Sequence, residues 1–245
     1  MKKLIIILLL LSFPCIVSSQ TGWTRFHTGV IYNPYSLTFV DSLNGMILYG
    51  NTVYVTFDGG ISWSMRNIQL TGTCFSLSSA HSGVIFACGY YSGSFNYGFI
   101  AKTTNLGVTW SETQIFDNYF NDIYFIDNNT GYCAGKYGVI VKTTNSGAQW
   151  FNIGGMEEYS QIFNCIYFTS PDTGYIGNEY GRIYKTFNGG YNWLEIPAYP
   201  LSRIKSLVFP SLDTGYCAGY LPSGAGYKSN FYKTTNRGSS WQCID

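Results

Sequence analysis

One eight-residue pattern recurs five times along this chain and constrains its fold more than any other feature. Each copy has a Thr, an Asx residue two positions later, a Gly two positions after that and a Trp three positions further on. Successive motif Trp residues are 47, 40, 43 and 48 positions apart. The copies are Thr56, Asp58, Gly60 and Trp63; Thr103, Asn105, Gly107 and Trp110; Thr143, Asn145, Gly147 and Trp150; Thr186, Asn188, Gly190 and Trp193; and Thr234, Asn236, Gly238 and Trp241. A period in the forties with short strand-like runs between turns is typical of a β-propeller, so the chain is predicted to be all-β.

Each repeat contains the pattern of four short strands. Apolar residues two positions apart mark the first strand, as in Ile123/Phe125, and Phe75/Leu77 is the pair assigned to the second repeat. Period two indicates a strand with one buried face. A turn, a second strand and a third strand ending at the motif Thr follow, and the Trp opens the fourth strand. This arrangement predicts about five four-stranded blades over residues 20–245, with repeats near 23–63, 64–110, 111–150, 151–193 and 194–241.

Trp23 precedes Trp63 by 40 positions and therefore belongs to the same series. The segment Trp23 to Phe26 resembles a fourth strand without its own blade. In a closed ring it could complete the last blade, although Trp241 also starts a fourth strand there.

Turn chemistry accounts for the motif without any catalytic role. An Asx side chain accepts hydrogen bonds from backbone N–H groups a few residues on, the Thr hydroxyl adds another bond, and Gly tolerates a positive φ. Asn accepts these bonds nearly as well as Asp. The Trp ring is then expected to pack between neighbouring sheets.

These turns resemble Asp-boxes, the bacterial neuraminidase repeats of sialidases and many other propellers. The longer run from Asp127 to Gly135, continuing to Trp150, is closer to the repeats of the photosystem II stability and assembly factor family. The resemblance covers about residues 23–245 and implies a propeller whose Asp-boxes lie on the face opposite the ligand site. Family members of the assembly-factor type have seven blades, whereas this chain has room for five, and only Asp58 matches the acidic position strictly.

The N-terminus has the features of a secretory signal peptide. Lys2 and Lys3 precede an apolar run that extends to Val17, and Ser18 and Ser19 come before Gln20. Cleavage before Gln20 would remove residues 1–19 and leave a secreted, periplasmic or cell-surface protein. No later segment approaches the roughly 18 apolar residues that span a bilayer, so no membrane span is expected in the mature chain.

Composition excludes one class of partner and favours others. Charged residues make up 11% of the chain and the net charge is +1, which argues against nucleic acid because phosphate binding needs clustered Lys and Arg. Aromatic residues reach 18%, more than five small cores need, so part of this aromatic surface is expected to be exposed.

Six cysteines follow the predicted signal peptide. Repeat alignment places Cys88, Cys133 and Cys217 at one equivalent position, and Cys74 and Cys165 at another. Equivalent positions in different blades need not meet, so buried free thiols are favoured. The one bridge considered is Cys74 to Cys88 across a hairpin.

The sequence contains no recognisable set of catalytic residues. A sialidase needs three clustered arginines, and none of the five arginines lies in the early motif that sialidases use. Glu157 and Glu158 form the only adjacent acidic pair and fit a solvated loop better than a glycosidase site. His27 and His81 have no metal-ligand spacing. No catalytic residue, cofactor or metal is therefore predicted, and the Lys residues that precede four motif Thr residues are interpreted as solvent-facing.

Two insertions between the second and third strands depart from the repeat, and they lie at residues 90–97 and 220–227. In a four-stranded blade this loop opens on the face opposite the Asp-box turns, together with the connections between blades. Aromatic residues gather in these segments and predict a binding face: Tyr90, Tyr91, Phe95, Tyr97, Tyr119, Phe120, Tyr159, Tyr220 and Tyr227.

The resulting hypothesis is an exported, non-enzymatic propeller that acts as a protein-binding or assembly scaffold. The alternative is a carbohydrate-binding propeller that uses the same rings. A third, weaker reading is a degenerate glycosidase or sialidase-like protein acting through Glu157 or Glu158. The partner is thus expected to be a protein or a glycan.

Overall fold

The computed structural model describes residues 34–68, 70–80, 83–91, 97–116, 119–154, 161–196, 203–223 and 226–244. The regular elements in these ranges are twenty β-strands arranged in five four-stranded antiparallel sheets. In each sheet the strands lie in chain order, from the first strand to the fourth. The all-β prediction with five four-stranded blades is therefore confirmed.

The strands have the following bounds. They are β1 Ser36–Phe39, β2 Gly45–Tyr49, β3 Thr52–Thr56 and β4 Ser64–Asn67 in the first blade; β5 Thr73–Ala80, β6 Val84–Tyr91, β7 Tyr97–Thr103 and β8 Ser111–Phe116 in the second; β9 Phe120–Phe125, β10 Gly131–Gly135, β11 Ile140–Thr143 and β12 Phe151–Asn152 in the third; β13 Phe163–Phe168, β14 Gly174–Asn178, β15 Ile183–Thr186 and β16 Leu194–Ile196 in the fourth; and β17 Arg203–Val208, β18 Gly215–Ser223, β19 Gly226–Thr234 and β20 Gln242–Ile244 in the fifth.

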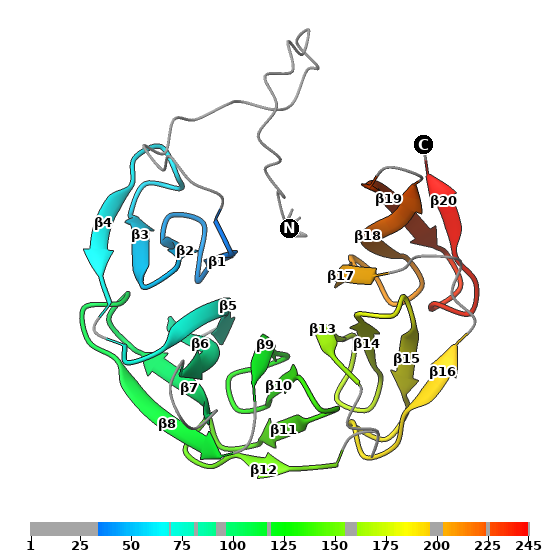
Figure 1. The fold of residues 1–245 in the computed structure, drawn as a ribbon. Coiled ribbons are helices and arrows are strands. Elements are labelled where there is room, and N and C mark those ends of the chain that lie inside the picture. Colours follow the sequence, from blue (N-terminus) through cyan, green and yellow to red (C-terminus); the bar gives the residue numbers. More distant parts are fainter. Residues whose placement is uncertain are drawn as a thin grey trace, which may run out of the picture.

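The blades are arranged around a common centre (Figure 1). The first strand of each blade lies nearest the centre and the fourth lies on the perimeter. The first and last blades face each other across an opening in the ring, and the three strands β1, β2 and β3 lie on one side of it. β20 occupies the fourth position of the last blade, so that position is already filled by the chain's own C-terminal strand.

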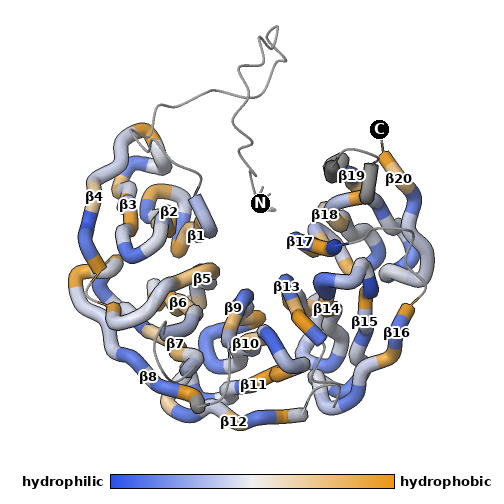
Figure 2. The backbone as a smooth tube through the Cα atoms, in the orientation of Figure 1, coloured by the Kyte–Doolittle hydropathy of each residue, from blue (hydrophilic) through white to orange (hydrophobic). Residues whose placement is uncertain are grey.

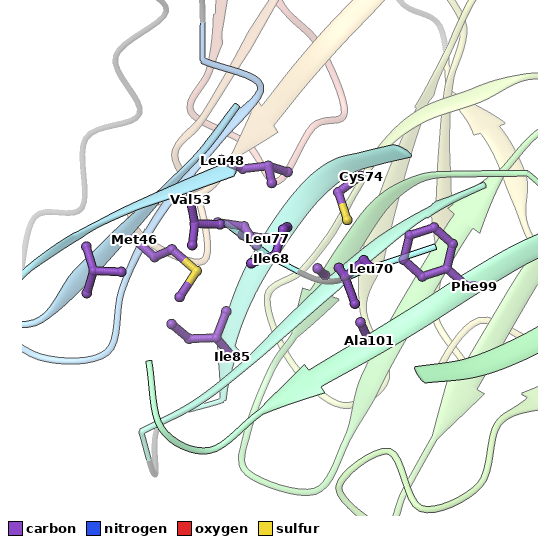
Figure 3. Close-up of a cluster of buried hydrophobic side chains, with 12 residues drawn as sticks. Met46, Leu48, Val53, Ile68, Leu70, Cys74, Leu77, Ile85, Phe99 and Ala101 are labelled. Carbon is purple, nitrogen blue, oxygen red and sulfur yellow. The ribbon is translucent and has the colours of Figure 1, made fainter. Parts of the chain in front are cut away.

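Apolar side chains between successive blades form the core. Four buried clusters lie one at each junction, and hydrophobic positions accordingly occur on the strands of every blade (Figure 2). At the first junction Leu48 and Val53 of the first blade point toward Leu77 of the second (Figure 3). Burying these rings and aliphatic chains contributes roughly 25 cal/mol per Å² and holds each sheet against the next. Four of the motif Trp residues pack against these clusters: Trp110, Trp150, Trp193 and Trp241.

All five Thr–Asx turns form the same hydrogen bonds. In the second blade the Thr103 hydroxyl donates to Asn105 Oδ1 and accepts the Gly107 N–H at 2.9 Å, and Asn105 Oδ1 accepts the Thr109 N–H at 2.9 Å. The turn with Asp58 has the same pattern, so replacing Asp by Asn leaves the turn intact, as predicted. In each turn the motif Gly and the residue before it have positive φ. In three turns that preceding residue is not Gly but Leu106, Ser146 or Arg237.

In the first, third, fourth and fifth blades the Thr–Asx turn lies beside the turn that joins the first two strands of the same blade. The Gly59 N–H donates to Leu43 O at 2.8 Å, and the Ser146 N–H donates to Asn129 O at 3.0 Å. These two kinds of turn therefore share one side of the propeller, which we call the turn face. The turns between second and third strands and the connections between blades lie on the opposite side, the connection face, because strands alternate in direction.

Three of the four lysines that precede a motif Thr point toward the next blade and not into solvent, which corrects the interpretation from the sequence for Lys102, Lys142 and Lys185. Lys102 Nζ donates to Ser146 O at 2.8 Å, Lys142 Nζ to Gly189 O at 3.1 Å and Lys185 Nζ to Arg237 O at 2.8 Å. Each acceptor is the same carbonyl in the turn of the next blade. Lys102 lies two residues after Ile100, which is buried against the third blade, so both side chains point toward that blade and the long Lys side chain reaches its turn.

The strand register corrects both cysteine alignments. Cys74 precedes the bulge of its inner strand and Cys165 follows the bulge of its own, so these two are not equivalent. Cys88 pairs with Ser76, whereas Cys133 and Cys217 pair one position further along, with Ile123 and Leu207. Cys74 and Cys88 lie in different core clusters, on opposite faces of their sheet, so they cannot form the bridge considered above. Both thiols are free and buried.

The predicted signal peptide and the segment from Trp23 to Phe26 lie outside the described residues. Of the residues that the structure describes, none belongs to a helix long and apolar enough to cross a membrane.

Candidate functional site

Six aromatic rings form a continuous row on the connection face of the first three blades. We call this set the aromatic row: Tyr49, Tyr35, Phe75, Tyr90, Tyr119 and Tyr137. Successive ring centroids are 6.4, 5.9, 5.5, 4.8 and 6.2 Å apart in that order. None of the six is fully buried, and the rings at Tyr35 and Tyr137 are 54% and 47% exposed.

The strands place these rings at the ends nearest the connection face. Tyr35 immediately precedes β1, Tyr119 immediately precedes β9, and Tyr49 and Tyr90 lie at the ends of β2 and β6. Tyr137 lies in the turn between β10 and β11 with φ of 61°, a left-handed conformation that turns its side chain outward.

Phe75 enters the row through a β-bulge. Cys74 pairs with Gly89 and Ser76 pairs with Cys88, which leaves Phe75 as the extra residue of the inner strand. A bulge re-aims the side chain of its extra residue. Phe75 is therefore only partly buried and stacks on Tyr90, and the expectation that it points into the core together with Leu77 was wrong.

One cation accompanies the row. Lys136 Nζ lies 4.6 Å from the centroid of the Tyr119 ring, and the Lys136 N–H donates to Tyr119 O at 2.9 Å. A cation over a ring face is attracted by the π-electrons. Partial burial, followed by the nearby Tyr137 and Tyr90 hydroxyls, raises the pKa of Tyr119, so this ring stays neutral.

Tyr91 has a different place from its neighbour Tyr90. Its ring packs against Phe99 at 5.0 Å, and its hydroxyl donates to Glu112 at 2.5 Å. Glu112 also accepts hydrogen bonds from the Thr71 N–H and hydroxyl. Burial and the bond to Glu112 raise the pKa of Tyr91. Tyr90 and Tyr91 point to opposite faces of the sheet because they are adjacent residues of one strand. Through Glu112, Tyr91 is linked to Thr71 in the connection between the first two blades.

The remaining predicted residues have separate locations. Phe120 is fully buried in the cluster between the second and third blades, which removes it from the exposed face. Tyr97 pairs with Tyr91 across β6 and β7, and Tyr220 pairs with Arg203 and Ser229 in the last blade. Tyr227 lies in β19 opposite Pro222. Phe95 and Tyr159 lie outside the described residues.

Ionic side chains occupy the connection face over the fourth and fifth blades. Glu179 pairs with Arg203 and with Lys205, the latter at 3.6 Å, and accepts a hydrogen bond from Asn164 at 2.8 Å. Nearby, Asn178 donates to Gln161 at 2.8 Å in a buried pair. The connection face is therefore aromatic on one half and ionic on the other.

A pocket of about 350 Å³ opens on the turn face. Tyr124 and Tyr167 line it with ring centroids 4.7 Å apart, together with Phe209 and Leu212. The two hydroxyls donate to Phe168 O and Phe209 O, each at 3.0 Å, and burial raises the pKa of Tyr124. The hydroxyls thus tie successive inner strands together and keep lone pairs for a further hydrogen bond.

The pKa of the Asp122 carboxyl group is shifted towards the neutral form. Burial raises its pKa from 3.8 to about 6, against the hydrogen bonds that favour the ionised form. Its carboxylate oxygens accept hydrogen bonds from the Ser76 hydroxyl at 2.6 Å, from the Ile166 N–H at 2.8 Å and from the N–H of the adjacent residue Ile123 at 3.0 Å. These donors belong to three successive inner strands, so Asp122 ties three blades together.

The described part of the chain contains no assembled metal site. His, Cys, Asp and Glu side chains form no cluster of three or more there that could hold a metal ion. Glu157, Glu158, His27 and His81 lie outside those ranges.

No protein-family model and no curated protein sequence matches this chain. Solved structures do match. The WD40 β-propeller domain of Doa1 is 9% identical with a TM-score of 0.59, over 86% of this chain and 82% of that chain. An ancestral GH74 enzyme is 13% identical with a TM-score of 0.60, over 86% of this chain and 40% of that chain. A structure of YCF48 bound to D1 peptide is 18% identical with a TM-score of 0.49, over 95% of this chain and 88% of that chain.

The blade architecture, together with the matches to the Doa1 domain and the GH74 enzyme, defines the chain as a five-bladed β-propeller. At such identities the likeness describes the fold and carries no ligand or activity from one protein to another.

Proposed function

We propose that this chain is an exported, non-enzymatic β-propeller that binds another protein through the aromatic row. The observation that carries this proposal is the continuity of six incompletely buried rings across three blades. Contiguous exposed apolar surface marks interaction sites, and aromatic residues are enriched in the cores of protein interfaces.

Ring geometry favours a protein over a glycan at this site. Sugar rings stack on the free face of an aromatic ring. In the row, Phe75 and Tyr90 cover each other's faces with an angle of 14° between planes, and Tyr35 and Tyr49 stack at 15°. Stacking takes up one face of each of these four rings, and the ring edges and Tyr hydroxyls of the row suit apolar side chains and backbone groups of a protein.

The surrounding carboxylates support a binding role. Glu179 is neutralised by Arg203 and Lys205, and Asp122 is enclosed by donors from three strands. Glycoside hydrolysis needs two carboxylates free to act across a cleft. Both of these groups instead hold the scaffold together.

A matched pair of variants tests the proposal. We would immobilise residues 20–245 and a row variant with Tyr90→Ser and Tyr119→Ser, and capture proteins from the envelope fraction of the source organism. The control carries Phe57→Ser and Phe151→Ser, two rings that are 51% and 55% exposed outside the row. A captured protein would then be purified, and its Kd measured for all three chains. We expect a loss of at least tenfold in affinity for the row variant alone; equal binding by the row variant and the wild type would contradict the proposal.

A second candidate function is glycan binding at the pocket on the turn face. The observation that favours it is that Tyr124 and Tyr167 line a 350 Å³ cavity, a volume within the range of small-ligand sites. Titration of glycans against intrinsic fluorescence tests this function. Saturable quenching that is weakened by Tyr167→Ala and unaffected by the row variant would establish it.

A further inference from the structure

Tyr137 has a backbone conformation that disfavours its side chain. Its φ of 61° and the φ of 69° at Gly138 are both positive, and the Val139 N–H donates to Lys136 O at 3.3 Å to close the turn. A turn with two positive φ values is usually formed by Asn-Gly or Gly-Gly, because a β-carbon crowds the following carbonyl oxygen there. Tyr137 is therefore a strained residue in the turn between β10 and β11.

The other described non-Gly residues with positive φ have a role in the scaffold. Each precedes a motif Gly, and its carbonyl oxygen accepts a hydrogen bond from a cation of the preceding blade. The pairs are Arg66 with Leu106 at 2.6 Å, Lys102 with Ser146 at 2.8 Å and Lys185 with Arg237 at 2.8 Å. Tyr137 lies outside these repeated turns, so its conformation needs another explanation.

The fourth blade shows that a Tyr at this position can avoid the strain. Strand register makes Tyr180 the equivalent of Tyr137, in the turn between β14 and β15. There Asn178 Oδ1 accepts the N–H groups of Tyr180 at 3.0 Å and Arg182 at 2.8 Å, and the positive φ falls on Gly181 alone. The fold therefore does not require a left-handed Tyr in this turn.

Packing within the chain gives Tyr137 little compensation. Its ring is 47% exposed and meets Tyr119 at an interplanar angle of 64°, with centroids 6.2 Å apart. A half-exposed ring gains little from burial. Strained residues that the folded chain does not compensate are concentrated at functional sites. Because Tyr137 is also the last ring of the aromatic row, its strain and its location both point to contact with a partner.

The residue before Tyr137 supplies a charge for the same contact. Lys136 Nζ lies 4.6 Å from the Tyr119 centroid, and no carboxylate of the described residues forms an ion pair with it. Glu179, the equivalent residue of the fourth blade, is paired with both Arg203 and Lys205. The charge of Lys136 is therefore available for a carboxylate of a partner, which would form a charge-assisted hydrogen bond with it.

We infer that the turn of Lys136 and Tyr137 anchors the protein partner at the aromatic row. Tyr137 packs against an apolar side chain of the partner, and Lys136 pairs with a carboxylate beside that side chain. This inference rests on the proposed function, since it names the contact that holds the partner at the same site. The strain is retained because the left-handed backbone turns the Tyr137 ring outward to where a partner covers it.

The first measurement is the stability of residues 20–245. Tyr137→Asn should raise the Tm by about 2–4 °C, because Asn tolerates a left-handed φ and the change removes the strain. Tyr180→Asn is the matched control, since Tyr180 is 52% exposed at the equivalent position, and it should shift the Tm by less than about 1 °C. A Tm that Tyr137→Asn lowers or leaves unchanged would overturn the inference.

The second measurement is binding of peptides. Random peptides displayed on phage would be selected on immobilised residues 20–245, with counter-selection on the row variant. We expect the selected peptides to carry Asp or Glu beside an apolar residue. Tyr137→Asn and Lys136→Met should each weaken the Kd of a selected synthetic peptide at least fivefold, and Tyr180→Asn should leave it unchanged. Added salt should weaken binding to the wild type more than to Lys136→Met.

The outcomes separate this inference from the proposed function. A wild type that selects no peptide over the row variant would overturn both. Peptides that depend on the row but bind Tyr137→Asn as tightly as the wild type would overturn the anchor and leave the proposed function standing. Selected peptides without carboxylates, or equal affinity of Lys136→Met and the wild type, would refute the ion pair in the anchor.

Discussion

The Phe125 ring lies directly on Gly131 of the neighbouring strand. A β-carbon at Gly131 would be 2.5 Å from Cζ of Phe125, closer than any real contact. Three other blades repeat this pair, as Phe39 with Gly45, Phe168 with Gly174 and Phe209 with Gly215. In the second blade the small residue, Ser79, lies on the first strand and the large residue, Ile85, lies opposite it on the second strand. Each blade thus fills one position with one large and one small side chain.

The first prediction concerns the size of this pair. Gly131→Ala should lower the free energy of unfolding by about 1–3 kcal/mol, because the methyl group overpacks the site against the Phe125 ring. Ser79→Phe alone should destabilise the second blade, since Ile85 fills the space. Adding Ile85→Gly should recover most of the loss. Urea denaturation of the single and double variants measures the coupling, and additive losses would contradict the pairing.

The second prediction concerns the Thr–Asx turn. Thr103 is 1% exposed and accepts the Gly107 N–H in a buried bond. Thr103→Val keeps the side-chain volume but leaves that N–H without an acceptor, which should cost about 1–3 kcal/mol. Chemical denaturation provides the measurement. Thr113→Val on the exposed surface of β8 is the control and should change stability by less than about 0.5 kcal/mol.

The third prediction concerns the cation between the fourth and fifth blades. Lys185 is 6% exposed and donates to Arg237 O across the junction. Lys185→Met should lower stability by about 1–2 kcal/mol through loss of this charged hydrogen bond. Lys136→Met, which changes a cation beside the aromatic row, should leave stability nearly unchanged. Equal effects on the melting temperature would show that Lys185 does not tie the blades together.

The fourth prediction concerns pH. Burial raises the pKa of Asp122 from 3.8 to about 6 in the folded chain. A raised folded pKa gives stability that is fully present below pH 3.8 and is lost as the pH rises through about 6. The wild type should therefore lose up to about 3 kcal/mol between pH 4 and pH 7 relative to Asp122→Ser.

Serine is the matched replacement for Asp122, because Ser36 and Ser76 have the equivalent position in the first two blades. The neighbouring thiols of Cys88 and Cys165 stay neutral in this range, since burial raises their pKa values as well. Urea denaturation at pH 4.5 and 7.5 provides the comparison. Parallel pH profiles for the two chains would exclude Asp122 as the titrating group.

The blade number and the turn geometry could be predicted from the sequence because both depend on local, repeated chemistry. A Thr hydroxyl, an Asx oxygen and a Gly at fixed spacing form the same turn wherever they occur. The exposed face was predicted less accurately. Tyr90 and Tyr119 were identified from their place in an insertion and a connection, and both lie in the aromatic row.

Phe120, next to Tyr119, was predicted to be exposed but is buried. Two adjacent aromatic residues in a connection do not show by their sequence which of them points inward. Phe75 was assigned to the core because its apolar spacing fits a regular strand, and only the bulge opposite Gly89 turns it outward. The Lys residues before the motif Thr residues were misread for a related reason. Their carbonyl partners lie in another blade, more than forty residues away in the chain.

The sequence by itself determined the period, the four-stranded units and the hydrogen-bonded turns, because each depends on residues within one repeat. Only the tertiary structure decided the contacts between neighbouring repeats. The register shifts of the inner strands, the contact of each Lys with the next turn and the joining of six rings into one row depend on how neighbouring sheets pack. Packing of this kind is set by side-chain volume and by the direction of each strand in three dimensions, and a linear pattern records neither.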